Sequence, residues 1–389
     1  MSYVPSGYDV KGENPEVVKL IALVAPAKAA GLTATFSLSG TTCYPGYCMN
    51  KGTSPEPDFA LPTNKTVAFA ADGTARIDLT SRDYAGYTQA RVDVKRGTKV
   101  VGWATKNVPL DENGDHIADC GWDATDGDHN SHAADPGKGH EGDDADNDPA
   151  GQGINGDNLT ALEEYRGFFV RDSHRRTDPT KKDLFAYSEV RIGGTPTIRY
   201  ASNLTCWTHR IYQGEMSAQA VINHIHGATM PGDGSHVNQR VVQIIPGGYN
   251  PDASGFTHQF NTNIPMAANY PNNTDFCEIY LRTIKEQTPT HFDQETTDPP
   301  DDAFTMRVIA HESGHATGIP HYQYGGTGTR LTVMAYVPDA GWPADFWNNI
   351  PSNYDADDMA QFQLKPTPSA CPHALDSFQH GIRWNRRHG

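Results

Sequence analysis

The sequence predicts a multidomain chain in which an all-β domain, an irregular acidic module and an α+β domain follow one another. Three observations lead to this prediction. Short β-like runs separated by turn residues fill the first part, a dense acidic block follows, and a helical metal-binding motif lies late in the chain. The three parts span residues 1–108, 109–194 and 195–389, and a chain of this length is expected to hold roughly two or three domains.

Residues 1–108 alternate runs rich in β-branched and apolar residues with turns that contain Gly, Ser and Asp. Turn signals separate the runs at the spacing of a β-sandwich. The predicted strands are 34–38, 66–69, 75–79, 90–94 and 100–104. This part resembles the immunoglobulin-like modules of bacterial surface proteins. The resemblance implies a role in spacing, docking or stability, with carbohydrate binding as the alternative.

The acidic block runs from Asp111 to Asp148 and holds one Lys or Arg residue, Lys138. Within the block, residues 111–119 carry oxygen-bearing side chains at alternate positions, which lets a tight loop direct them to a hard cation. Beside the block, residues 155–165 are similar to the second half of an EF-hand loop, with Glu164 near its end able to bind bidentately. The pair is similar to thrombospondin type 3 or EF-hand-like calcium repeats. The resemblance implies Ca²⁺ as a cofactor. The predicted calcium ligands are Asp111, Asn113, Asp115, Asp119, Asn155, Asp157 and Glu164.

Two alternatives to calcium binding remain for the acidic module. A block of like charge this dense is usually disordered, so it can serve as a solvated linker. The other alternative is a transition-metal site formed by His129, His132 and His140. Residues 166–195 are basic and turn-rich, and they are predicted to be a connector.

The C-terminal part shows the mixed pattern of an α+β domain. Strands are predicted at 197–200, 240–245 and 276–284, and helices at 215–225 and 352–362. The helix that carries the metal motif is predicted to begin near Ala303. Asp301 and Asp302 would then cap it and place negative charge at its N-terminus.

The motif helix places His311, Glu312, His315, Gly318 and His321 in the order H-E-x-x-H-x-x-G-x-x-H. Histidines four residues apart lie on one helical face, so His311 and His315 can bind one ion. Gly318 can end the helix in the left-handed conformation, and the chain then turns back so that His321 becomes a third ligand. Three imidazoles leave one tetrahedral position for water, as in a catalytic zinc site. Glu312 is placed to hold that water and to act as the general base.

A short apolar segment after the motif contains Met334 and, two residues later, Tyr336. An extended zinc motif followed by such a methionine is the signature of the metzincin peptidases, and the C-terminal part resembles that clan. Met-x-Tyr is similar to the astacin and serralysin branches, while Tyr322 after the third histidine differs from the usual branch markers. The resemblance implies a twisted sheet above an irregular lower part, with Met334 packed under the metal. It also implies that Tyr336 ligates zinc or binds the oxyanion; a core tyrosine is the alternative.

Net charge, apolar content and cysteine number indicate which binding partners and which cellular location to expect. The net charge of −16 argues against nucleic acid or an anionic membrane as partner, and no run approaches the ~20 apolar residues of a membrane helix. Residues 1–18 show no signal-peptide pattern. The even number of cysteines, the acidic motifs and the peptidase motif nevertheless favour a secreted or cell-surface protein with up to three disulfide bonds. The cysteines are Cys43, Cys48, Cys120, Cys206, Cys277 and Cys371.

Together these features predict a secreted zinc metalloendopeptidase with Zn²⁺ and Ca²⁺ as cofactors and a protein or peptide as substrate. Glu312 would assist the attack of a zinc-bound water on the peptide bond. One alternative is a calcium-stabilised surface or adhesion protein with an inactive peptidase-like domain. A zinc hydrolase that acts on another class of substrate is the second alternative.

Overall fold

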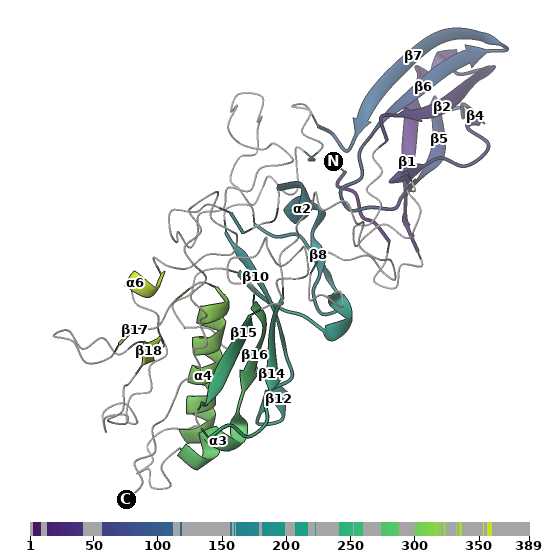
Figure 1. Ribbon diagram of the computed structural model, residues 1–389. Helices are drawn as coiled ribbons and strands as arrows, with labels where there is room; N and C mark the ends of the chain where they lie inside the picture. The colour runs from purple at the N-terminus through teal and green to yellow at the C-terminus, as the bar shows by residue number, and fades with distance from the viewer. Residues whose placement is uncertain are drawn as a thin grey trace, which may run out of the picture. The chain divides into compact units, whose positions relative to one another are not determined.

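The computed structural model describes most of the N-terminal part and separate segments of the rest of the chain (Figure 1). The described residues are 3–8, 14–41, 57–111, 117–118, 156–157, 159, 161–178, 181–198, 207–216, 222, 241–251, 253–259, 274–287, 300–317, 319, 322–323, 332, 334–336, 353 and 356–359. Strands outnumber helices in these segments. None of the described helices is both long enough and apolar enough to span a membrane.

The chain divides into two compact units. The first unit contains Met1–Asp144, Leu159–Pro179 and Asn223–Asp233. The second unit contains Ala145–Asn158, Thr180–Ile222 and Gly234–Gly389. The residues of the predicted acidic module are therefore shared between the two units.

Two antiparallel sheets form the body of the first unit. One sheet has the order β1-β5-β3, with strands Glu16–Leu23, Thr74–Ser81 and Phe59–Ala60. The other has the order β4-β2-β6-β7, with strands Thr66–Ala68, Leu32–Ser39, Thr88–Arg96 and Lys99–Val108. A short 3-10 helix, Pro26–Lys28, lies between β1 and β2. The chain changes sheet at every connection from β1 to β6, so β6 and β7 are the only strands of these two sheets that are both consecutive and paired.

The core of this unit lies between the two sheets. Every second residue of β5 is buried, which is the pattern of a strand with one face in a core. Ala75 and Ile77 of β5 pack with Ala22 of β1 and with Ala34 and Phe36 of β2, so both sheets contribute to one cluster. Apolar surface between two facing sheets is what holds such a sandwich together.

The five predicted N-terminal strands correspond to β2, β4, β5, β6 and β7, whereas β1 and β3 were not predicted. β1 carries apolar residues on both faces, and its outward residues Val17, Ile21 and Leu23 are more than half exposed. Its sequence therefore lacks the alternation that reveals a half-buried strand.

A helix and a hairpin extend the first unit beyond the sandwich. Helix α2 spans Ala161–Arg166, and β8 (Phe168–Phe169) pairs with β9 (His174–Arg175). Ala161 and Tyr165 of α2 pack with Ile117, Ala118 and Ala85, the last of which follows β5. This apolar cluster attaches the end of the second predicted calcium loop, which contains Glu164, to the sandwich.

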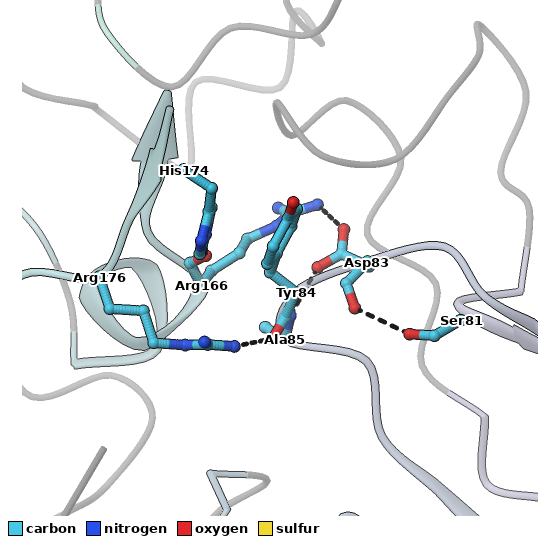
Figure 2. Close-up of polar contacts among 7 residues, drawn as sticks. All are labelled: Ser81, Asp83, Tyr84, Ala85, Arg166, His174 and Arg176. Carbon is cyan, nitrogen blue, oxygen red and sulfur yellow. Dashed lines mark hydrogen bonds and ion pairs between the residues drawn. The ribbon is translucent and has the colours of Figure 1, made fainter. Parts of the chain in front are cut away.

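Polar contacts reinforce that attachment (Figure 2). Arg166 forms an ion pair with Asp83, and both side chains are buried. The second oxygen of Asp83 accepts a hydrogen bond from the Ala85 amide at 2.8 Å. Arg176 donates hydrogen bonds to the carbonyl oxygens of Tyr165, at 2.5 Å, and Tyr84, at 2.9 Å. Arg166 and Arg176 thus bind the Asp83 carboxylate and the Tyr84 carbonyl of the other segment, whereas the bond to Tyr165 lies within their own segment.

His174 lies in the same contact. Its ring stacks on Tyr84 with 3.5 Å between ring centroids, and its Nε2 lies 2.7 Å from the Arg166 carbonyl oxygen. Burial lowers the pKa of His174 to about 3, so the ring is neutral at physiological pH. Because the Arg166 carbonyl can only accept, Nε2 carries the proton.

The second unit is built around a mixed five-stranded sheet with the order β13-β10-β14-β16-β15. The strands are Trp207–Arg210, Asp183–Ser188, Val242–Pro246, Thr274–Ile279 and Gly255–Gln259. Neighbouring strands run parallel except β15, which is antiparallel to β16 at the edge of the sheet. Helix α4 (Pro300–Ala316) packs along β14, β15 and β16, and helix α3 (Leu281–Gln287) contacts α4 (Figure 1).

Smaller elements complete the described part of this unit. β11 (Arg191–Ile192) and β12 (Thr195–Pro196) form a hairpin, and a 3-10 helix spans Gln213–Glu215. β17 (Tyr322–Gln323) runs parallel to β18 (Ala335–Tyr336), and helix α6 spans Ala356–Met359.

Several sequence predictions in this unit were wrong. The predicted strand at 276–284 is two elements, because β16 ends at Ile279 and α3 begins at Leu281. Leu, Arg, Lys, Glu and Gln in that segment favour a helix, and Arg282 pairs with Glu286 one turn later. Strand β10 lies in the predicted connector, and Thr197 and Ile198 belong to no strand.

The helix boundaries also differ from the predictions. Helix α4 begins at Pro300, a residue that suits a first helical position, so Asp301 and Asp302 lie inside the first turn instead of capping it. Helix α6 spans Ala356–Met359, and residue 353 is not helical, so the helix begins later than the predicted 352. Residues 352, 354–355 and 360–362 of the predicted helix lie outside the described residues. Most of the predicted helix at 215–225 also lies outside them.

Candidate metal centre

Helix α4 carries the first part of the metal motif into the interior of the second unit. Acidic residues in its first turn complement the helix dipole. Phe304 and Val308 are fully buried one turn apart, and His311 and Glu312 continue the buried surface. His311 and Glu312 therefore lie on the buried side of α4, together with Phe304 and Val308.

His311 and His315 lie one above the other, as the spacing predicts. Their Nε2 atoms are 3.1 Å apart, and the two rings stand nearly perpendicular. Two nitrogens bound to one tetrahedral zinc at about 2.0–2.1 Å are roughly 3.3 Å apart. The observed separation therefore fits two ligands of the same ion.

The tautomer of His315 also fits metal binding. Its Nδ1 lies 2.8 Å from the carbonyl oxygen of Ile319, which can only accept a hydrogen bond. The proton is therefore on Nδ1, and Nε2 carries the lone pair that a metal needs. A backbone carbonyl commonly orients a ligand histidine in this way.

The end of α4 returns the chain toward the helix. The Ile319 amide donates to the Gly314 carbonyl at 3.0 Å, a bond five residues long that is typical of a Schellman ending. Gly318 and His321 lie outside the described residues. The left-handed conformation of Gly318 at the end of the helix and the role of His321 as third zinc ligand therefore stay predictions.

The backbone just after His321 lies beside the predicted methionine segment. Tyr322 pairs with Ala335, and Gln323 pairs with Tyr336, in the parallel ladder of β17 and β18. Met334 is fully buried, which suits a packing role. The side chain of Tyr336 lies outside the described residues.

Glu312 is fully buried against the edge strand β15. Its Oε2 accepts a hydrogen bond from Thr257 Oγ1 at 2.7 Å. Its Oε1 is buried and has no hydrogen-bond partner among the described residues. Burial raises the pKa of Glu312 to about 8, while the Thr257 hydrogen bond and the charge of Arg307 act in the opposite direction.

Arg307 is a buried cation on α4, roughly one turn before His311. Burial lowers the pKa of Arg307 to about 9, and the Glu312 charge opposes that shift. Sequence reasoning missed Arg307, although a lone cation within the apolar run around Val308 was a visible signal. It also missed Thr257 and Gly255, because their segment was not predicted as a strand.

Cys277 of β16 lies beneath the same site. Its thiol is free and fully buried, and Sγ is 3.5 Å from the Glu312 carbonyl oxygen. Burial raises the pKa of this thiol strongly. With Cys277 unpaired, the predicted upper limit of three disulfides falls to two. The other five cysteines lie outside the described residues.

The described part of the chain contains no group of three His, Cys, Asp or Glu side chains placed to hold an ion. His311 and His315 supply two of the three predicted zinc ligands. Their nitrogen donors and the orphaned oxygen of Glu312 fit a catalytic zinc site, in which protein ligands leave a position for water.

Three predicted calcium ligands are described, and all three are buried: Asp111, Asp157 and Glu164. Asp157 accepts a hydrogen bond from the Asp183 amide at 2.6 Å, and Glu164 Oε1 accepts one from Thr177 Oγ1 at 3.3 Å. Asp157 belongs to the second unit, whereas Asp111 and Glu164 belong to the first. The remaining predicted calcium ligands and the three histidines of the alternative metal site lie outside the described residues: Asn113, Asp115, Asp119, Asn155, His129, His132 and His140.

Comparisons with known proteins gave no match, whether the chain was set against protein-family models, curated proteins or solved structures.

Proposed function

We propose that the second unit is a zinc-dependent endopeptidase domain of the metzincin type. The convergence of the His311 and His315 Nε2 atoms, 3.1 Å apart beside a buried Glu312, carries this proposal. A five-stranded sheet along which the motif helix packs, and a buried methionine after the motif, are further features in its support.

His311, His315 and His321 would hold the zinc ion. A bound zinc ion supplies a Lewis acid that polarises a carbonyl group and lowers the pKa of a coordinated water. Glu312 would take the proton of the attacking water on Oε1 and deliver it to the leaving amine. Tyr336 would bind the oxyanion or ligate the metal. Because Glu312 is buried, its carboxylate is poorly solvated and is therefore a stronger base than an exposed one.

The edge of the sheet fits an extended peptide as substrate. β15 is the last strand of its sheet, and no described strand pairs with its other edge. An extended peptide can add to such an edge through backbone hydrogen bonds. Because β15 also contacts Glu312, a peptide bound there would lie close to the proposed base.

The test of this function measures zinc content and proteolysis on the full chain. We expect about one zinc ion per chain, cleavage of a denatured protein, loss of cleavage with 1,10-phenanthroline, and recovery when zinc is restored. A His315→Ala variant should lose both zinc and cleavage. Zinc binding without cleavage would instead favour the inactive surface protein, and cleavage that persists in metal-free protein would exclude the proposal.

For the first unit we propose an immunoglobulin-like sandwich joined to a calcium-binding segment, in a secreted or cell-surface protein. Its two facing antiparallel sheets and the buried carboxylates of Asp111 and Glu164 support this assignment. Carboxylate oxygens are the ligands that calcium prefers.

Removal of calcium is expected to lower the unfolding temperature by several degrees, because an ion that binds only the folded state stabilises it. Thermal unfolding should be compared in calcium and in EGTA, with zinc held at a constant free concentration. A Glu164→Gln variant should show a smaller difference between the two conditions. Identical unfolding curves with and without calcium would exclude the calcium site.

A further inference from the structure

Two residues of the edge strand contact the Glu312 side chain. Thr257 and Gly255 are two positions apart on β15, so both point to the same face of the sheet. That face packs against α4. The base of the proposed reaction is therefore enclosed partly by a strand distant from it in sequence.

The hydroxyl of Thr257 has two acceptors on Glu312 within reach. It lies 2.7 Å from Oε2 and 3.0 Å from the Glu312 carbonyl oxygen. A hydroxyl has one proton, and a hydrogen bond to an ionised carboxylate is stronger than one to a neutral carbonyl. When Glu312 is ionised, Thr257 therefore holds its Oε2.

Gly255 provides the space that the carboxylate occupies. A Cβ at this position would lie 2.7 Å from Glu312 Oε1, 2.8 Å from its Cγ and 2.7 Å from Val308 Cγ1. These separations are below van der Waals contact. The backbone of Gly255 is not in the left-handed region, so the constraint at this position is the lack of room and not the backbone conformation.

We propose that Thr257 and Gly255 are positioning residues that fix the orientation of the Glu312 carboxylate for catalysis. This inference rests on the proposed function. The Thr257 hydroxyl holds Oε2, and the space at Gly255 accommodates Oε1. The Glu312 carboxylate is therefore kept in one orientation instead of moving among several rotamers. A base held in its reactive orientation works faster than a mobile one.

The first test compares Thr257→Val with Thr257→Ser in the zinc-loaded full chain. Valine keeps the β-branched shape and removes the hydroxyl, so kcat should fall about 10- to 100-fold while KM and zinc content stay unchanged. Serine keeps the hydroxyl and should retain kcat within about threefold. The matched control is Thr35→Val, which removes an exposed threonine hydroxyl from β2 in the first unit and should leave kcat unchanged.

Wild-type kcat in Thr257→Val would overturn the positioning role, and so would an equal loss in Thr257→Ser. A rise in KM alone would also overturn it, because the residue would then act in substrate binding. A zinc-loaded wild-type protein that cleaves nothing would overturn the proposed function itself, so the two failures can be told apart.

A second measurement does not depend on activity. The unfolding temperatures of Thr257→Val, Glu312→Ala and the double variant form a double-mutant cycle. We expect the effects to be non-additive, because each single change removes the same hydrogen bond. Gly255→Ala should lower kcat in the active protein by displacing the carboxylate. Additive temperatures together with unchanged kcat in Gly255→Ala would overturn the contact and the proposal.

Discussion

Replacement of Glu312 by alanine is expected to leave zinc bound and to lower kcat by about 10³- to 10⁴-fold, the range of general acid–base catalysis. The ligand nitrogens of His311 and His315 are not altered by this change. Glu312 Oε1 is the oxygen proposed to take the proton, and no described side chain hydrogen-bonds it. Without that carboxylate, no positioned base would accept the proton of the attacking water.

A Glu312→Gln variant sharpens the test because it keeps the size of the side chain. Its amide oxygen can still accept the Thr257 hydrogen bond, but it cannot take a proton. Loss of activity in both variants would assign the effect to proton transfer. The unfolding temperature of Glu312→Gln should not fall, since glutamine keeps the size of the side chain and the acceptor for Thr257 and brings no charge into the buried site.

The measurements are zinc per chain and kcat on a peptide substrate. Glu278→Gln is the matched control, because Glu278 lies on β16 next to Cys277 but on the opposite face, where Tyr280 donates a hydrogen bond to it at 2.8 Å. We expect little change in kcat for this control. Retention of more than about a tenth of the activity in Glu312→Ala would exclude Glu312 as the base.

The parts of the fold that sequence predicted are those with a local period. β5 alternates buried and exposed residues, so its pattern predicts a strand with one buried face. β10 shows the opposite case. Nearly all of its residues are buried, as in a parallel strand covered on both faces, so no alternation marks it. Because the residues before β10 are basic and turn-rich, the sequence predicts a connector there instead of a strand.

In the candidate site, too, features that follow from a local sequence period were predicted, and contacts between distant segments were not. The spacing of His311 and His315 follows from the helical period, and both side chains lie where that period places them. Thr257 contacts Glu312 across a separation of 55 positions. Only the pairing of β15 with β16 and the packing of α4 bring them together, and no local pattern in the sequence contains that information.

The Asp83–Arg166 contact is likewise non-local, with 83 positions between its partners. Replacing Arg166 with methionine is expected to destabilise the first unit by about 3–5 kcal/mol, the cost of leaving a buried charge without its partner. Methionine keeps an apolar side chain of similar length. The loss would therefore come from Asp83, which is fully buried and would keep its charge without a partner.

Hydrogen exchange in urea, read on peptides from β5 and β6, measures the stability of the first unit separately from the second. Lys19→Met is the matched control, because Lys19 pairs with Asp78 on the surface of the same unit, where both side chains are about half exposed. An exposed pair contributes about 0–1 kcal/mol. An equal effect of the two substitutions would show that burial of the Asp83–Arg166 pair is not the source of stability.

A second change separates charge burial from lost packing. Asp83→Asn removes the charge and keeps an oxygen that can accept the Ala85 amide. In the Arg166→Met background it should restore most of the lost stability, because no unpaired charge is then buried. If the double variant is as unstable as Arg166→Met, the contribution of Arg166 to stability does not come from its ion pair with Asp83. The attachment of α2 would then depend on its apolar contacts through Ala161 and Tyr165.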